Sequence, residues 1–248
     1  MVILKSLQEI DKIRKACLVV ANVLQVIRTK VRAGITTKEL DDLAEQFIRD
    51  AGAKPAFKGY RGYPCCLCTS VNEQVVHGIP SKAVVLRQGD IISIDVGAVV
   101  DGFYGDAAIT LPVGPISNEA ERLIRITEES LLMGIAEAVP GNRLYDISAA
   151  VQSHVEAHGF SVVRDFVGHG IGRNLHEDPQ IPNFGDRGGG PKIKAGMVLA
   201  IEPMVNAGGF VTKVTGDGWT AVTVDGSLSA HFEHTIAVMA DGPLILTR

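Results

Sequence analysis

The sequence predicts an α+β fold in which helices cover a central antiparallel sheet and two similar halves are related by a pseudo-twofold axis. Three observations support this prediction. Apolar residues recur at helical spacing in four segments, apolar runs typical of strands end on acidic residues, and the same order of segments occurs twice along the 248 residues. We therefore expect a single domain over residues 1–248, with internal halves of about 5–112 and 113–248.

Two helices are predicted in the first half. In the first helix, the steps between apolar residues alternate between three and four, which places one face against a core: Ile10, Ile13, Cys17, Val20, Leu24, Ile27 and Val31. A Ser-x-x-Glu capping box begins this helix at Ser6, and Gly34 ends it. A Thr-x-x-Glu box opens the second helix at Thr36, and Gly52 closes it.

The second half repeats this pattern. Helices are predicted over residues 117–138 and 144–158. The glycines that end helices in the two halves are 107 residues apart, and the apolar run that leads to Asp95 matches the run that leads to Glu202 at the same offset. Chance similarity is the alternative, but a gapless offset that also superposes two acidic residues argues against it. A carboxylate from each half should therefore approach the other near the axis.

Composition and charge exclude several classes of protein. Apolar residues make up 46% and charged residues 21%, with a formal net charge of −4, so the chain is neither disordered nor rich in the basic residues that hold a nucleic-acid backbone. Charged residues follow the N-terminus at once, and the longest apolar stretch, residues 16–27, is interrupted by Asn22 and Gln25. We expect no secretory signal, no membrane span, no direct nucleic-acid readout and a cytoplasmic location.

The cysteine pattern agrees with a reducing compartment. Three of the four cysteines, Cys65, Cys66 and Cys68, crowd into four residues and leave Cys17 as the single remaining partner. This spacing does not build a disulfide framework, and the sequence shows no second Cys or His pair at a zinc-ligand distance. Reduced thiols are expected.

Two aspartates are placed for joint chemistry. Asp95 ends one apolar run and Asp106 begins the next, with an Asp-Gly turn signal at 101–102 between them. A turn at 100–101 would place the two carboxylates directly opposite each other, whereas a turn at 101–102 would make them diagonal neighbours on one face, within roughly 5–8 Å. Two like charges so close favour a bound cation or, alternatively, a shared proton.

Other segments supply further types of metal ligand. His169 lies among glycines that permit close backbone approach, and Glu202 and Glu233 each lie in an apolar run. A lone Glu233 would be interpreted as a salt-bridged residue. Two Asp, two Glu and one His together form an oxygen-rich set that suits a pair of divalent ions such as Mn, Fe, Co or Zn.

Several longer motifs together are highly specific for one protein family. They are Pro55–Tyr60, Ser70–Pro80, Asp95-Val-Gly with Gly105-Asp106, Phe166–Gly172, Glu202–Met204, Asp217–Thr220 and Phe232–Thr235. Through them, residues 5–248 resemble a type I methionine aminopeptidase, which implies the pita-bread fold. Type II members insert a helical subdomain between the last two glutamate ligands, whereas Glu202 and Glu233 are 31 residues apart. Prolidases and aminopeptidases P share the five ligands but normally carry an N-terminal domain, which we do not expect in this protein.

The resemblance also implies how the five ligands act. Asp95 would chelate one metal, Asp106 and Glu233 would bridge both, and His169 with Glu202 would complete the other. A hydroxide bridging the two metals would attack the carbonyl of an N-terminal methionine whose free amine docks at the metal held by Asp95. Glu202 is expected to pass the water proton to the leaving amine.

Further residues are assigned by the same resemblance. His77 and His176 would contact the substrate amide and the developing oxyanion, with His176 as the oxyanion donor. The wall of a snug apolar methionine pocket would consist, besides these histidines, of Phe57, Tyr60, Tyr63, Cys68 and Trp219. Leu175 stands where many relatives have an aromatic residue, which predicts a slightly wider entrance for the second residue of the substrate.

Three additional expectations concern residues near this site. His231 is left out of the ligands because many relatives have Gln there, and a supporting hydrogen bond is its expected role. No role beyond packing is predicted for the Cys65-Cys66 pair. A structural monovalent cation, as in some relatives, would be held by Asn72, Gln74 and Ser229.

The expected function is removal of the N-terminal methionine from nascent proteins and peptides, with a preference for a small second residue. The expected partners are nascent polypeptide N-termini and the ribosome near its exit tunnel, and the self-contained size predicts a monomer. Two rival functions remain. An adaptor of the same fold would have lost metal ligands, and an Xaa-Pro imidodipeptidase would carry the N-terminal domain and lack the Asp217–Thr220 motif.

Overall fold

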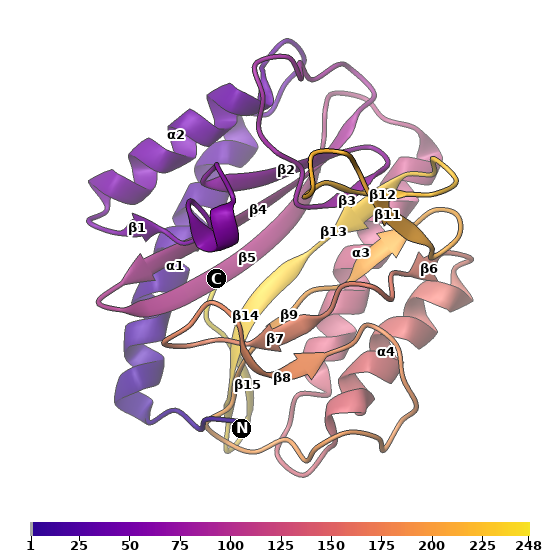
Figure 1. Cartoon of the computed structure of the whole chain (residues 1–248). Helices are drawn as coiled ribbons and strands as arrows, with labels where there is room; N and C mark the ends of the chain where they lie inside the picture. Colours follow the sequence, from indigo (N-terminus) through magenta and orange to yellow (C-terminus); the bar gives the residue numbers. More distant parts are fainter. Residues whose placement is uncertain (1) are drawn as a thin grey trace.

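Four helices pack around a curved antiparallel sheet (Figure 1). The computed structural model describes residues 2–248. The helices are α1 (Leu7–Lys30), α2 (Thr37–Asp50), α3 (Asn118–Ala136) and α4 (Leu144–Ala157), with a short 3-10 turn at Tyr60–Gly62. The strands are β1 (Lys54–Pro55), β2 (Leu67–Val71), β3 (Gln74–Val76), β4 (Ile91–Val100), β5 (Phe103–Pro112), β6 (Ser161–Val162), β7 (Gly168–Gly170), β8 (Glu177–Ile181), β9 (Val198–Ile201), β10 (Met204–Asn206), β11 (Thr212–Val214), β12 (Ala221–Thr223), β13 (Ser229–His231), β14 (Glu233–Met239) and β15 (Gly242–Ile245).

The helices begin and end close to the predicted residues. Ser6 and Glu9 form the expected capping box at α1, and Thr36 and Glu39 form the one at α2, because each N-cap oxygen accepts the backbone N–H three residues further on. Within residues 2–248, none of the helices combines the length and the apolar composition that crossing a membrane requires.

The nine-stranded sheet follows the order β1-β4-β5-β14-β9-β7-β8, with β2 paired to β4 and β15 paired to β14. Strands β5 and β14 are neighbours at its centre, and β4 and β9 flank this pair on opposite sides. The internal repeat makes β4 and β9 equivalent. Figure 1 shows α1 and α2 beside the strands of the first half and α3 and α4 beside those of the second. Two three-stranded sheets, β13-β10-β6 and β11-β12-β3, complete the fold. The predicted α+β architecture is confirmed.

The hairpin between β4 and β5 decides between the two predicted turns. Its loop is Asp101-Gly102, with φ angles of 50° and 76°. Positive φ at both loop residues is the geometry of a type I′ turn, which Asp-Gly favours. In this register Gly97 lies opposite Asp106, so Asp95 and Asp106 are diagonal neighbours rather than a directly opposed pair.

Helix α1 approaches the central sheet closely at Gly105 of β5. A Cβ atom on Gly105 would lie 2.6 Å from the backbone nitrogen of Cys17 in α1, so a larger residue would force the helix away. The predicted inner face of α1, including Ile13 and Val20, is buried, except that Val31 is half-buried and caps the end of the helix. Because Gly105 precedes Asp106, the packing of α1 fixes β5 at the point where it delivers a candidate ligand.

Candidate metal centre and adjoining pocket

Five neighbouring strands each deliver one of the predicted metal ligands. Asp95 lies in β4, Asp106 in β5, Glu233 at the start of β14, Glu202 directly after β9 and His169 in β7. These strands are adjacent in the sheet in that order. Side chains far apart in the sequence therefore converge on one cavity of about 160 Å³, and all five predicted ligands line it.

The cluster is buried and short of hydrogen-bond partners. Ligand atoms of Asp106, His169 and Glu233 all lie within 4.8 Å of one another, and Nε2 of His169 lies 3.5 Å from Oε1 of Glu202. One carboxylate oxygen in each of Asp95, Asp106 and Glu233 is buried without a hydrogen-bond partner among the described residues. Buried polar atoms are normally paired, so these oxygens indicate a site for a cation.

Burial and mutual repulsion disfavour the ionised form of the four carboxyl groups. Desolvation raises the pKa values of Asp95, Asp106, Glu202 and Glu233, and neighbouring carboxylates add to the effect at the last three. A divalent cation reverses this balance because it compensates several negative charges at once. A proton shared between Asp95 and Asp106 would account for two of these groups and leave the other donors unexplained.

The imidazole of His169 is oriented as a metal ligand. Its Nδ1 lies 2.9 Å from the carbonyl oxygen of Gly170, and a carbonyl only accepts, so Nδ1–H is the donor. Burial lowers the pKa of His169 to about 4, which keeps the ring neutral near pH 7. The lone pair of Nε2 is therefore directed at the carboxylates. Together the five donors form an oxygen-rich set with one imidazole, which fits Mn, Fe, Co or Zn.

His77 and His176 reach the same cavity from loops. The ring of His176 lies 4.3 Å from that of His169, measured between centroids, and its Nδ1 lies 2.8 Å from Oη of Tyr60. His77 has a φ of 61°, a left-handed conformation that costs a non-glycine residue free energy and recurs at functional sites. Desolvation lowers the pKa of both histidines, to about 3 for His176, so both rings are neutral near pH 7.

All the predicted pocket residues line this cavity: Phe57, Tyr60, Tyr63, Cys68 and Trp219. Tyr63 and Trp219 meet edge to face, with ring centroids 5.1 Å apart. Leu175 lines the cavity too, but it is 2% exposed and belongs to the same apolar cluster as Tyr63. This burial argues against a position at an open entrance, and the effect of Leu175 on the second residue of the substrate stays a prediction. The chain turns at residues 172–174 and directs this side chain into the buried wall.

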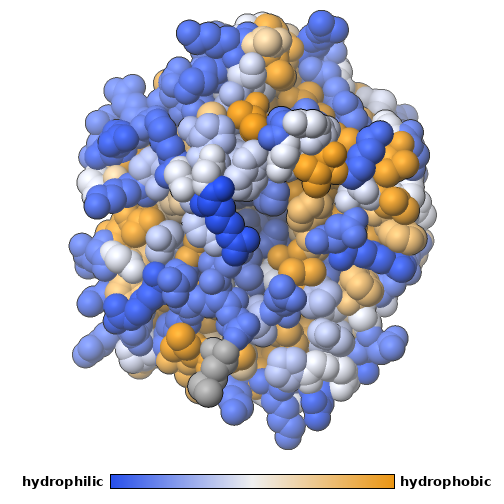
Figure 2. All heavy atoms as spheres, viewed as in Figure 1, coloured by the Kyte–Doolittle hydropathy of each residue, from blue (hydrophilic) through white to orange (hydrophobic). Residues whose placement is uncertain are grey.

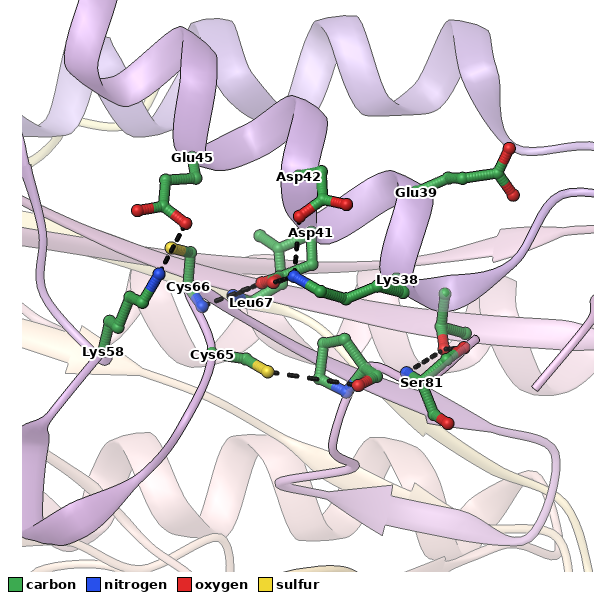
Figure 3. Close-up of polar contacts among 12 residues, drawn as sticks. Lys38, Glu39, Asp41, Asp42, Glu45, Lys58, Cys65, Cys66, Leu67 and Ser81 are labelled. Carbon is green, nitrogen blue, oxygen red and sulfur yellow. Dashed lines mark hydrogen bonds and ion pairs between the residues drawn. The ribbon is translucent and has the colours of Figure 1, made fainter. Parts of the chain in front are cut away.

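Helix α2 anchors the segment that carries the pocket wall (Figure 3). One carboxylate oxygen of Asp41 accepts the backbone N–H groups of Cys66 and Leu67 at 2.8 and 2.9 Å, and the other pairs with Lys38 at 2.8 Å. The hydroxyl of Tyr63 donates to the carbonyl oxygen of Leu67 at 2.9 Å, which ties the wall to the same backbone. No motif in the sequence singles out Asp41. A carboxylate beside the apolar face of a helix is the signal that could have revealed it.

His231 lies next to the ligand cluster. Its Nε2 is buried 3.7 Å from Oε2 of Glu202, with no hydrogen-bond partner among residues 2–248. This position fits the expected supporting role, since a small movement would bring the two groups into hydrogen-bond distance. Around the predicted monovalent-cation site, the carbonyl oxygen of Asn72 accepts the N–H of Ser229, and the cation stays a prediction. All four cysteines are free and buried, as expected.

The combination of buried carboxylates, one neutral imidazole and an adjoining apolar pocket is that of a metal-dependent hydrolase. A comparison with protein families supports this class. The model of metallopeptidase family M24 matches residues 11–240, which include all five predicted ligands. Members of a metallopeptidase family bind divalent metal, and the donor set of this chain fits such an ion.

Relatives of known class narrow the assignment. The methionine aminopeptidase of Clostridium perfringens is 59% identical over 247 residues, which cover 100% of this chain and 99% of that protein. Methionine aminopeptidase 1 of Bacillus subtilis is 54% identical over 100% of both chains. The crystal structure of methionine aminopeptidase from Thermotoga maritima superposes with a TM-score of 0.99 at 50% identity, again over 100% of both chains. The chain therefore belongs to the methionine aminopeptidases of metallopeptidase family M24.

A more distant structure confirms the fold. The prolidase from Pyrococcus horikoshii superposes with a TM-score of 0.81 at 23% identity, over 99% of this chain and 63% of that one. The pita-bread fold expected from the sequence motifs is thus shared across the two groups of enzymes.

Proposed function

We propose that this chain removes the N-terminal methionine from peptides and nascent proteins whose second residue is small. The observation that carries the proposal is that one cavity joins the five-ligand cluster to a wall of aromatic and aliphatic side chains. A hydrolytic centre beside an apolar pocket suits cleavage next to a flexible apolar side chain such as methionine. The similarity to methionine aminopeptidases over the whole chain supports the same reaction.

The five ligands would hold two divalent ions, as the family resemblance implies. Asp106 and Glu233 would be shared between them, Asp95 would bind one, and His169 with Glu202 would bind the other. Such ions supply Lewis acidity, which activates water near neutral pH and polarises the scissile carbonyl. A free N-terminal amine would dock beside Asp95, and this requirement would restrict cleavage to the first residue of a chain.

Two side chains would handle the proton and the developing negative charge. Glu202, whose side chain is 13% exposed, would carry the water proton to the leaving amine. The hydroxyl of Tyr60 can donate to Nδ1 of His176, and a neutral ring then carries its proton on Nε2. His176 would thereby present a donor to the oxyanion, and His77 would contact the substrate amide.

The cellular setting is part of the proposal. Substrates would be the N-termini of nascent chains, and the enzyme would act as a monomer in the cytoplasm, near the ribosomal exit tunnel. Four free, buried cysteines support a reducing compartment.

Hydrolysis of defined peptides tests this function. Purified protein reconstituted with Mn or Co is incubated separately with Met-Ala-Ser and with Ala-Pro, and free amino acids are quantified. We expect release of methionine from the first peptide and no hydrolysis of the second. Cleavage of Ala-Pro without release of methionine would favour the imidodipeptidase, and inactivity of metal-loaded protein towards both would favour the adaptor.

A further inference from the structure

Arg61 lies where the methionine pocket opens towards a second hollow. It lines both the cavity at the metal centre and a neighbouring groove of about 420 Å³ over β7 and β8. His169 and His176 also line both, so the groove begins at the candidate metal centre. Figure 2 shows a hollow in the middle of this face with strongly hydrophilic atoms beside it. The groove offers a path to the part of a substrate that follows its first residue.

The backbone of Arg61 adopts a conformation that its side chain does not favour. Its φ is 49° and its ψ is 24°, between Gly59 and Gly62, which have φ angles of 87° and 89°. Glycine adopts such angles freely, whereas a residue with a Cβ atom pays in free energy. The Arg61 side chain is exposed, and its guanidinium lies 5.4 Å from the centre of the Tyr60 ring. Core packing therefore does not explain an arginine in this turn, and strain of this kind points to function.

The guanidinium of Arg61 is unpaired among the described residues, although two acidic residues, Glu177 and Asp178, line the same groove. Within residues 2–248, no carboxylate lies within ion-pair distance of its guanidinium. The nearby Glu177 in the groove is already engaged, because it pairs with Lys5 and accepts the backbone N–H groups of Arg173 and Asn174. Arg61 thus presents a positive charge to whatever occupies the groove.

We propose that Arg61 is a specificity-determining residue that favours substrates with an acidic side chain at the third position, directly after the small second residue. This inference rests on the proposed function and names the substrate class more narrowly. An extended peptide advances roughly 3.4 Å per residue. A substrate that places its first residue in the cavity and leaves along the groove would therefore bring its third residue close to Arg61, which lines both. A carboxylate there meets an exposed guanidinium, whereas a lysine meets a like charge.

Three amidated peptides test the preference: Met-Ala-Glu-Gly, Met-Ala-Gln-Gly and Met-Ala-Lys-Gly. For the wild-type enzyme we expect kcat/KM to fall by about threefold from Glu to Gln and again from Gln to Lys, the size of effect that one exposed ion pair produces. Arg61→Gln should abolish the differences in kcat/KM among the three peptides. Its kcat/KM for the Gln peptide should stay within about twofold of wild type. Added salt should reduce the differences in kcat/KM among the three peptides in the wild type, because exposed charges are screened.

Two further variants separate a specificity role from a structural one. Arg28→Gln removes the same charge from an exposed position in the last turn of α1 and should leave the peptide order unchanged. Arg61→Gly relieves the positive φ, so it should lose the preference while its Tm stays equal to that of the wild type or rises. A third-residue preference that survives in Arg61→Gln would overturn the proposal. An equal fall in kcat/KM with all three peptides would also overturn it, because Arg61 would then bind every substrate regardless of its third residue.

The outcome also distinguishes this inference from the proposed function. Hydrolysis of all three peptides by the wild type at equal rates would contradict the role of Arg61 and leave methionine removal intact. Failure of the metal-loaded wild type to cleave any of them would contradict the proposed function and, with it, this inference.

Discussion

The predicted metal ligands and the predicted pocket wall share one cavity, but they are held by different kinds of structure. Four of the predicted ligands lie on adjacent strands of the central sheet and Glu202 directly follows a fifth, so their positions follow from strand register. The wall from Phe57 to Cys68 lies largely on an irregular segment, and Asp41 of α2 fixes part of it through two backbone hydrogen bonds. The difference indicates that the fold itself places the chemistry, whereas substrate choice depends on a segment that can change without altering the sheet.

Substitution of a ligand that is proposed to bridge both ions should have the largest effect. Asp106→Asn or Glu233→Gln removes one negative charge from the cluster and is expected to abolish turnover while the fold survives. Bound metal per chain and the rate of methionine release from Met-Ala-Ser measure the change, and circular dichroism checks the fold. A variant that keeps more than about a tenth of wild-type activity would contradict a two-ion assignment.

His176 should contribute to the reaction without holding metal. His176→Ala is expected to retain the wild-type metal content and to lower kcat by roughly 10²–10³, the loss typical of one oxyanion donor. Metal analysis and kcat for Met-Ala-Ser measure the two quantities on the same preparation. An unchanged kcat, or a loss of bound metal, would show that the assigned role is wrong.

The stability of the metal-stripped protein should depend on pH through the same carboxyl groups. Their pKa values are raised in the folded state, so the folded protein binds more protons than the unfolded one above their ordinary range of about 4. Stability should therefore fall as the pH rises from about 5 to 8, and added divalent metal should restore it. Urea unfolding at several pH values measures this. A stripped protein whose stability does not change over that range would contradict the burial argument.

Among the residues that support the pocket wall, Asp41 should affect both the free energy of unfolding and the binding of substrate. Asp41→Ala leaves two buried N–H groups without an acceptor, which should cost about 1–3 kcal/mol of unfolding free energy and raise KM for Met-Ala-Ser. Asp42→Ala is the matched control, because Asp42 also pairs with Lys38 but its side chain is 61% exposed. Equal effects of the two substitutions would show that the backbone anchor is unimportant.

The smallest effect is expected at Leu175. Because this side chain is buried in the wall, Leu175→Phe should crowd the methionine pocket and raise KM for all methionine peptides, at a cost of about 1–2 kcal/mol in stability. The ratio of kcat/KM between Met-Ala-Ser and Met-Val-Ser should stay within twofold. A larger change in that ratio with an unaltered KM would place Leu175 at the site of the second residue after all.

The parts of the molecule that the sequence predicts well are those with local or repeated signals. The capping boxes at Ser6 and Thr36 set the start of two helices through contacts three residues apart. The four acidic residues of the predicted ligand set stand out because carboxylates within or beside apolar runs require a partner, and His169 stands out because glycines flank it. The burial of Leu175 and the role of Asp41 depend instead on contacts between distant segments, such as α2 with residues 66–67, which no local pattern encodes.

The central claim is that this buried cluster binds divalent metal and that the bound metal enables removal of an N-terminal methionine. The most direct measurement titrates Mn or Co into chelator-stripped protein by calorimetry, with methionine release from Met-Ala-Ser assayed at each point. We predict no release without metal, activity that rises with metal bound up to two ions per chain, and neither strong binding nor activity in Glu233→Gln. Full activity of the stripped protein, or wild-type binding and turnover in Glu233→Gln, would contradict the claim.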